Sequence, residues 1–235
     1  SMDEGKINTV HFGIDQGVGI RVVEKDTTGY AFSDDLSMKK LVETARVASE
    51  VARSGSRSAS ISRAEPPRRI FARIPLESAT EREKLDLVKR ADAAVRSHDP
   101  RITSATVSHY DETRRIAIAN SNGLWIEDEK PIIYFTVWAQ ASEGERSHRG
   151  RSRRSATKGM EFFEETPPEE PAVTAAREAI AMLDADEAPS GEMPVVVEAG
   201  WGGVLFHEAV GHGLEGDSIY AKTSFYYGKL GQRVA

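Results

Sequence analysis

The sequence contains no cysteine among its 235 residues. This absence excludes disulfide bonds, thiol nucleophiles, iron–sulfur clusters and zinc sites built from thiolates. The chain also has no run of about 18 apolar residues, the length that a membrane-spanning helix needs, so we expect no membrane partner. Its opening segment lacks the charged-then-apolar pattern of a secretory signal. Together these absences favour a cytoplasmic protein.

The chain has no excess of positive charge either, since its formal net charge is −6 and 39% of its residues are hydrophobic. This balance gives no general attraction for nucleic acids or anionic membranes. The stretch Glu145–Gly159 is an exception because it is rich in arginine. It could hold phosphates, but it is rich in Ser and Gly and no aromatic residues interleave with its arginines. We therefore expect a solvated loop there and no direct nucleic-acid binding.

The N-terminal part predicts a β-hairpin followed by a helix. Apolar residues in Gly17–Asp35 flank a polar turn at Glu24–Thr28, with Gly29 in the bend region. Ser37 is the expected N-cap of the next helix and Gly55 its stop. The apolar positions that the spacing predicts for this helix are Leu41, Val42, Ala45, Val47 and Val51.

The middle of the chain predicts two helices around a β-meander. A Ser-, Arg- and Pro-rich connection over 54–67 precedes a helix whose capping box is Ser78 with Glu81 or Thr80 with Glu83. Strand-forming segments then run from 102 to 140, separated by expected turns at 111–114, 121–123 and 128–131. A further amphipathic helix is predicted over 168–185.

These elements predict an α+β fold in which antiparallel sheets pack against amphipathic helices. We divide the chain into an N-terminal α/β subdomain at 1–55, a central α+β domain at 56–188 and a third segment at 189–235. In the third segment, a buried strand at Val195–Val197 is expected to lead through glycines into a helix.

That helix carries HEAVGH, a candidate metal motif with unusual spacing. In the zinc-binding pattern H-E-x-x-H the histidines lie at i and i+4, whereas His207 and His212 lie five residues apart. Five steps of a regular α-helix leave them roughly 140° out of line. A π-helical turn suits an i+5 period, and Gly211 and Gly213 are placed to permit it. In a zinc site, the two histidines would be ligands and Glu208 the general base.

Two simpler interpretations of the motif stay open at this point. The histidines could be hydrogen-bonded core residues, and Glu208 could pair with His212 on the helix surface, because the two are also four residues apart.

The run MPVVVEAGWGGVLFHEAVGHGLEGD (193–217) resembles the signature of the TldD/PmbA family of bacterial and archaeal metalloproteases, and in particular the TldD member, which bears H-E-x-x-x-H. IDQGVGIRVV, TGYAFSDDLS and REKLDLVKRADAAVR resemble other family segments in the same order. The resemblance implies a zinc-dependent peptidase in which His207 and His212 bind Zn²⁺ and Glu208 is the base. It also implies a heterodimer with a TldE/PmbA-like paralogue. The family is further described as a modulator of DNA gyrase and a processor of peptide-antibiotic precursors and antitoxins.

The sequence departs from that family in two respects. Family members are about twice as long. The resemblance also implies a third zinc ligand, a cysteine far downstream of the histidines, and this chain has no cysteine. We therefore expect a truncated chain that holds the N-terminal domains and the start of the C-terminal metalloprotease domain (189–235). Such a chain should bind zinc weakly or not at all and be inactive. Glu215 or Asp217 could replace the third ligand, but a structural or capping role is expected for them.

The sequence thus predicts a zinc-dependent peptidase subunit that hydrolyses extended or unfolded peptides through metal-activated water and a glutamate base. The alternative is a non-catalytic peptide-binding or scaffold subunit of the same heterodimeric family. The intact histidine pair favours the enzyme, whereas the missing cysteine argues against activity of this chain.

Overall fold

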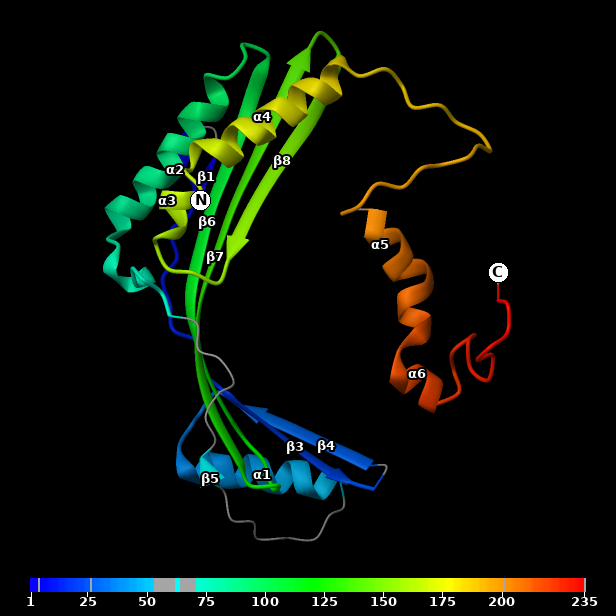
Figure 1. Ribbon diagram of the computed structural model, residues 1–235. Helices are drawn as coiled ribbons and strands as arrows, with labels where there is room; N and C mark the ends of the chain where they lie inside the picture. The colour runs from blue at the N-terminus through cyan, green and yellow to red at the C-terminus, as the bar shows by residue number, and fades with distance from the viewer. Residues whose placement is uncertain (4, 26, 53–61, 64–70, 201, 235) are drawn as a thin grey trace. The chain divides into compact units, whose positions relative to one another are not determined.

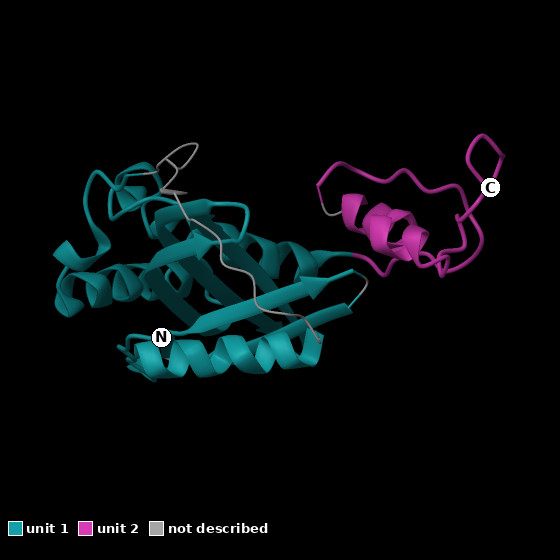
Figure 2. Ribbon diagram, turned by 90° about the horizontal axis from the view of Figure 1, so that it is seen from below, with its two compact units in different colours: residues 1–185 teal, residues 186–235 magenta. Residues whose placement is uncertain are grey.

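The computed structural model describes residues 1–235 except 4, 26, 53–61, 64–70, 201 and 235, and it has the predicted α+β fold with antiparallel sheets (Figure 1). The chain divides into two compact units, Ser1–Ala185 and Asp186–Ala235 (Figure 2). Among the described residues, no helix is both long and apolar enough to cross a membrane.

The N-terminal hairpin and its helix are confirmed. Strand β3 (Val18–Glu24) pairs antiparallel with β4 (Thr27–Ser33), and α1 (Met38–Ala52) packs on both. The expected buried face of α1 is wrong, because the side chains of Val42, Val47 and Val51 are exposed. The helix instead buries small residues at every fourth position, which lets the hairpin approach closely: Thr44, Ala48 and Ala52.

Gly29 explains this close approach. It lies within β4, opposite Val22, and not in the bend where we expected it. A Cβ atom on Gly29 would lie 1.9 Å from the carbonyl oxygen of Ala48, so only glycine fits against α1. The bend itself holds Lys25 with a φ of 53°. The expected stop at Gly55 falls outside the described residues.

The central sheet is built on two long strands. Strand β6 (Ile102–Ala119) pairs antiparallel with β7 (Leu124–Glu143) over nearly its whole length. The predicted turns at 111–114 and 128–131 are therefore wrong, and of the three only the turn at 121–123 is present. The two supposed turns lie opposite each other in register, with Thr113 facing Pro131.

Ion pairs within and between the two strands accommodate the charged residues of this stretch. Arg115 Nε lies 2.9 Å from Glu129 Oε2 on the facing strand. Arg114 pairs with Glu112, and Lys130 with Asp128, along their own strands. Pro131 lacks a backbone N–H but lies outside the part of β7 that pairs with β8 (Arg146–Ala156), which begins at Ile133. Its missing N–H therefore costs no hydrogen bond to β8.

The expected loop over 145–159 is also wrong. Its residues form β8 (Arg146–Ala156), which pairs antiparallel with β7 from Ile133 to Glu143. Two short strands, β1 (Met2–Asp3) and β2 (Lys6–Ile7), extend the sheet on the β6 side. Strand β5 (Ser62–Arg63), the described part of the predicted connection, pairs parallel with the start of β7.

Helices cover one face of this sheet. The helix α2 (Glu81–Arg96) contacts β6, and α4 (Glu169–Asp184) contacts β7 and β8. Thr80 and Glu83 form the capping box of α2, the second of the two predicted alternatives. Two short helices complete this layer, η1 (Leu76–Ser78) and α3 (Phe162–Glu165). The core between the layers includes Val95, Val107, Ile133, Phe135, Val137 and Leu183.

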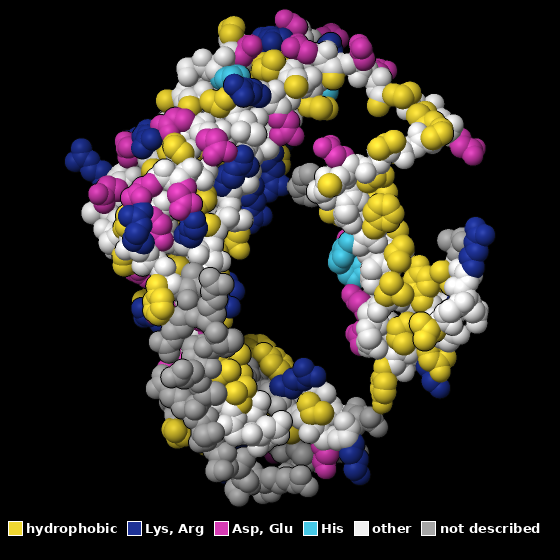
Figure 3. Space-filling model, viewed as in Figure 1, with side chains coloured by type: hydrophobic (Ala, Val, Ile, Leu, Met, Phe, Trp, Pro, Cys, Tyr) yellow, Lys and Arg dark blue, Asp and Glu magenta, His cyan; other side chains and the backbone are white. Residues whose placement is uncertain are grey.

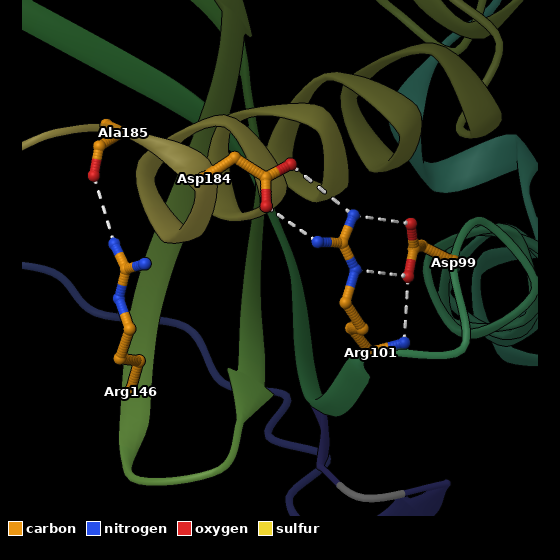
Figure 4. Close-up of polar contacts among 5 residues, drawn as sticks. All are labelled: Asp99, Arg101, Arg146, Asp184 and Ala185. Atoms are coloured by element: carbon orange, nitrogen blue, oxygen red, sulfur yellow. Dashed lines mark hydrogen bonds and ion pairs between the residues drawn. The ribbon is translucent and has the colours of Figure 1, made fainter.

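A polar cluster fixes the end of α4 to the sheet (Figure 4). Arg101 Nη1 donates to Asp184 Oδ1 at 2.7 Å, and Arg101 Nε donates to Asp99 Oδ1 at 3.1 Å. Arg146 Nη2 donates to the carbonyl of Ala185 at 3.0 Å. These bonds hold the last residues of the first unit against the start of β6 and of β8.

Candidate metal centre

The second unit contains a series of short helical segments, and the histidine motif lies within them. Its elements are α5 (Gly202–Phe206), the π-helix η2 (His207–Gly211), the 3₁₀-helix η3 (His212–Leu214) and α6 (Gly216–Tyr220). The strand expected at Val195–Val197 is not formed. These valines lack a strand partner among the described residues, and Val196 is 98% exposed.

The π-helical turn predicted from the i+5 spacing is confirmed. The backbone N–H of His212 donates to the carbonyl of His207, which is the i to i+5 hydrogen bond of a π-helix. The wider turn brings both rings to the same side, with 4.5 Å between their centroids and 62° between their planes. The irregular helix therefore removes the geometric objection to the motif.

The same turn brings Glu208 to the two histidines. Potential ligand atoms of His207, Glu208 and His212 all lie within 4.8 Å of one another. All three residues are exposed, so the two histidines are not core residues of this unit. The surface pair is present as a loose contact, with 3.6 Å between His212 Nε2 and Glu208 Oε2. Figure 3 shows the histidine side chains of this unit at its surface.

Glu215 orients the second histidine. Its Oε1 lies 2.7 Å from His212 Nδ1, which leaves Nε2 as the ring nitrogen directed at the cluster. The hydrogen bond and charge of Glu215, followed by the charge of Glu208, raise the pKa of His212 above its usual value. A carboxylate behind a ligating histidine fixes its tautomer in many metal sites. The i, i+3 spacing of His212 and Glu215 could have indicated this role in the sequence.

Three further residues that the sequence singled out lie in this unit, namely Asp217, Gly211 and Gly213. Asp217 accepts the backbone N–H of Ser218 at 2.8 Å, which is a role within its own helix. Gly211 and Gly213 have ordinary helical backbones, so neither glycine is there for a left-handed conformation. A Cβ on Gly213 would lie 2.6 Å from Tyr226 Cε2, so this glycine makes room for the Tyr226 ring.

Comparison with known proteins matches three consecutive family models. The models are the PmbA/TldA metallopeptidase domain 1 at residues 1–52, the central domain at 74–183 and the C-terminal domain at 190–235. The chain belongs to the PmbA/TldD metallopeptidase family. The resemblance that its motifs indicated is thereby confirmed.

Curated relatives of this PmbA/TldD chain include a metalloprotease TldD homolog of Haemophilus influenzae, 33% identical over 242 residues, which cover 99% of this chain and 50% of that protein. A metalloprotease of Methanothermobacter thermautotrophicus is 30% identical over 240 residues, covering 100% of this chain and 51% of the relative. The chain thus spans about half the length of the curated relatives that it matches.

Solved structures show the same fold. The structure of a candidate modulator of a DNA gyrase from Thermotoga maritima has a TM-score of 0.72 at 19% identity, covering 98% of this chain and 52% of that chain. TldE from Thermococcus kodakarensis has a TM-score of 0.58 at 15% identity, covering 89% of this chain and 47% of that chain.

Proposed function

We propose that the full-length protein is a zinc-dependent peptidase subunit whose site includes His207, Glu208 and His212. The observation that carries the proposal is the π-helical turn, which groups two imidazoles and a carboxylate within 4.8 Å in a chain of a metallopeptidase family. A regular α-helix would place the two rings on different sides, whereas the π-helical turn suits the five-residue spacing of the two histidines.

The donor set suits zinc. Imidazole nitrogen and carboxylate oxygen are both ordinary zinc ligands, and His212 has its Nδ1 engaged by Glu215 and its Nε2 directed at the cluster. His207 and His212 would hold the ion, with a third ligand from the part of the relatives' length that this chain does not span. We therefore propose that this chain alone binds zinc weakly and is inactive.

In the proposed peptide hydrolysis, Glu208 and Glu215 have different roles. When bound, zinc supplies Lewis acidity that makes water nucleophilic near neutral pH. Glu208, whose Oε2 lies 3.6 Å from His212 Nε2, accepts the proton of the attacking water and returns it to the leaving amine. Glu215 holds the His212 ring in one tautomer and orientation, which is a positioning role.

We further propose that the substrates are extended or unfolded peptides and that a TldE/PmbA-like paralogue completes a heterodimer. One of the structural neighbours is itself a TldE, which supports a pairing of related chains. Domains at 1–55 and 56–188 would precede the start of the metalloprotease domain at 189–235 in this assembly. Unfolded peptides should be cleaved and a rigid, stable domain should not.

The deciding experiment tests whether Glu208 is the general base or a zinc ligand. In the full-length protein with its paralogue, zinc content and peptide hydrolysis are measured for Glu208→Gln, His212→Ala and the control Asp217→Asn, whose carboxylate serves its own helix. Glu208→Gln should keep zinc and lose about 10²- to 10⁴-fold in rate, since this is the usual contribution of a general base. His212→Ala should lose both, and Asp217→Asn neither.

Three results would count against the proposal. Loss of zinc in Glu208→Gln would make Glu208 a ligand, and retained hydrolysis in that variant would remove the mechanism. Absence of both zinc and hydrolysis in the wild-type heterodimer would favour the non-catalytic peptide-binding or scaffold subunit instead.

A further inference from the structure

The arginines of β8 alternate between two environments. Arg149, Arg151 and Arg153 are exposed on one face of the sheet, whereas Gly150 and Ser152 between them are buried. A Cβ on Gly150 would lie 2.1 Å from the carbonyl oxygen of Ala175, so the even-numbered positions face α4. The three odd-numbered arginines, here called the arginine row, thus lie on the face opposite α4. Figure 3 shows Lys and Arg side chains gathered along β8.

Strand pairing places aromatic rings beneath this row. Trp138 of β7 lies directly opposite Arg151, and the Arg151 guanidinium carbon is 4.7 Å from the Trp138 ring centroid. The guanidinium carbon of Arg153 is 4.5 Å from the ring centroid of Tyr134. These cation–π contacts hold the guanidinium groups over the sheet face and reduce the entropy that they would lose on binding a ligand. Aromatic residues therefore interleave with the arginines across the strands, although they do not along the sequence.

The described residues of the first unit do not neutralise the charge of the arginine row. Among the residues that the structure describes, no carboxylate lies within 4.0 Å of the guanidinium groups of Arg151 and Arg153, although the backbone N–H of Arg151 donates to Glu178 at 2.8 Å. Arg149 Nε donates to the neutral amide oxygen of Gln140, at 3.3 Å. Arg154 on the other face differs, because it pairs with Glu170 at 2.8 Å. A guanidinium carries five donors in a planar fork, so the row offers unused hydrogen-bonding capacity beside an apolar surface.

We propose that the arginine row, with Trp138 and Tyr134, is a binding surface for an extended acidic segment of another polypeptide. Alternate residues of a strand lie roughly 7 Å apart, which is also the spacing of alternate side chains on one face of an extended peptide. Carboxylates at alternate positions of such a segment could each meet one guanidinium in a bidentate pair. Trp138, with 41% of its surface exposed, provides apolar contact between the charges.

The observations favour a peptide over a nucleic acid. Proteins that bind single-stranded nucleic acids stack bases on aromatic faces, but arginines of this chain already stack over Trp138 and Tyr134. The net charge of −6 opposes association with a polyanion as large as a nucleic acid. This surface lies in the first unit, so the proposal goes beyond the peptidase site and is independent of zinc.

The test measures peptide binding by fluorescence anisotropy at physiological salt, with the whole chain. The probe is a labelled peptide of alternating Glu and Thr, compared with its Gln–Thr analogue. The double variant Arg151→Gln/Arg153→Gln should weaken binding of the acidic probe by roughly tenfold, as expected for two exposed charge pairs. The matched control Arg154→Gln/Arg177→Gln removes the same charge from the side that α4 covers, where Arg177 is an exposed residue of that helix, and should change binding less than about twofold. Thermal unfolding by circular dichroism checks that both variants are folded.

A further double variant separates the effect of the guanidinium geometry from that of its charge. Arg151→Lys/Arg153→Lys should lose most of the affinity, because lysine keeps the charge but neither the bidentate geometry nor the flat stack. Full affinity in this variant would overturn the proposal. Equal binding of the Gln–Thr peptide, an equal loss in the matched control, or tighter binding of single-stranded DNA than of the acidic peptide would overturn it as well.

Discussion

The carboxylate of Glu161 gives the sharpest stability prediction. Its Oε1 accepts the backbone N–H of Arg73 at 3.0 Å and of Gly159 at 3.2 Å, and its Oε2 accepts that of Ile74 at 2.9 Å. The side chain thereby ties the segment that enters the central domain to the turn after β8. Only 7% of Glu161 is exposed. Replacing it by glutamine removes the charge and points an amide N–H₂ group at backbone donors.

The expected change in folding free energy follows from the pKa of Glu161. Burial would raise the pKa of Glu161, but the backbone N–H donors outweigh it and hold the pKa at about 2, below the ordinary 4.5. At about 1.4 kcal/mol per pKa unit, the difference corresponds to about 3 kcal/mol of folding free energy. Because the folded-state pKa is the lower one, this contribution is complete above pH 4.5 and is lost as the pH falls toward 2.

The measurement compares Glu161→Gln with the wild type in urea unfolding followed by circular dichroism between pH 7 and pH 2. The free energy of unfolding should differ by about 3 kcal/mol at pH 7 and converge as Glu161 becomes protonated. Amide exchange at Ile74 should accelerate in the variant. Glu164→Gln is the matched control, since this exposed neighbour pairs with Arg73 at the surface and should cost about 1 kcal/mol or less. A difference that stays constant from pH 7 to pH 2 would refute the linkage argument.

Three further substitutions test packing and capping. Gly150→Ala should lower the free energy of unfolding by about 2 kcal/mol or more, because a Cβ would lie 2.1 Å from the carbonyl oxygen of Ala175; urea unfolding measures it. Gly213→Ala should accelerate amide exchange at Tyr226, whose ring fills the space of the new methyl group, whereas Gly216→Ala, which meets nothing within 4 Å, should not. Thr80→Ala should lower the unfolding free energy by about 1 kcal/mol through loss of the capping box, and an unchanged melting temperature would contradict this.

Patterns that act over short sequence distances could be predicted from the sequence. The i+5 spacing of His207 and His212 predicts a π-helical turn because the hydrogen bond that defines it joins those same two residues. The capping box at Thr80 and Glu83 is local in the same sense. The hairpin β3–β4 also depends on neighbouring residues, and it is present with its turn where the polar residues indicated.

Features that depend on distant segments were predicted wrongly. The residues at 111–114 have the composition of a turn, yet they extend in register with residues 130–133 of β7. Next to them, Arg115 pairs with Glu129 across the two strands. The valines of α1 have helical spacing, but the buried face is set by where Gly29 of β4 can approach. The neighbouring residues in the sequence do not indicate which distant strand a segment will pack against. The domain boundaries at 55 and 188 and the roles of the site residues stay predictions.

The arginine-rich stretch shows how the same limitation hid a candidate function. Along the sequence its arginines are separated by serine and glycine, and this composition favours a solvated loop. In the sheet, serine and glycine at the even-numbered positions are what allow α4 to pack closely on β8. That packing fixes the strand, and the strand in turn sets Arg151 and Arg153 over aromatic rings that lie 13 and 19 residues earlier in the chain. Small residues between charged ones therefore indicate a loop only where no helix is available to cover them.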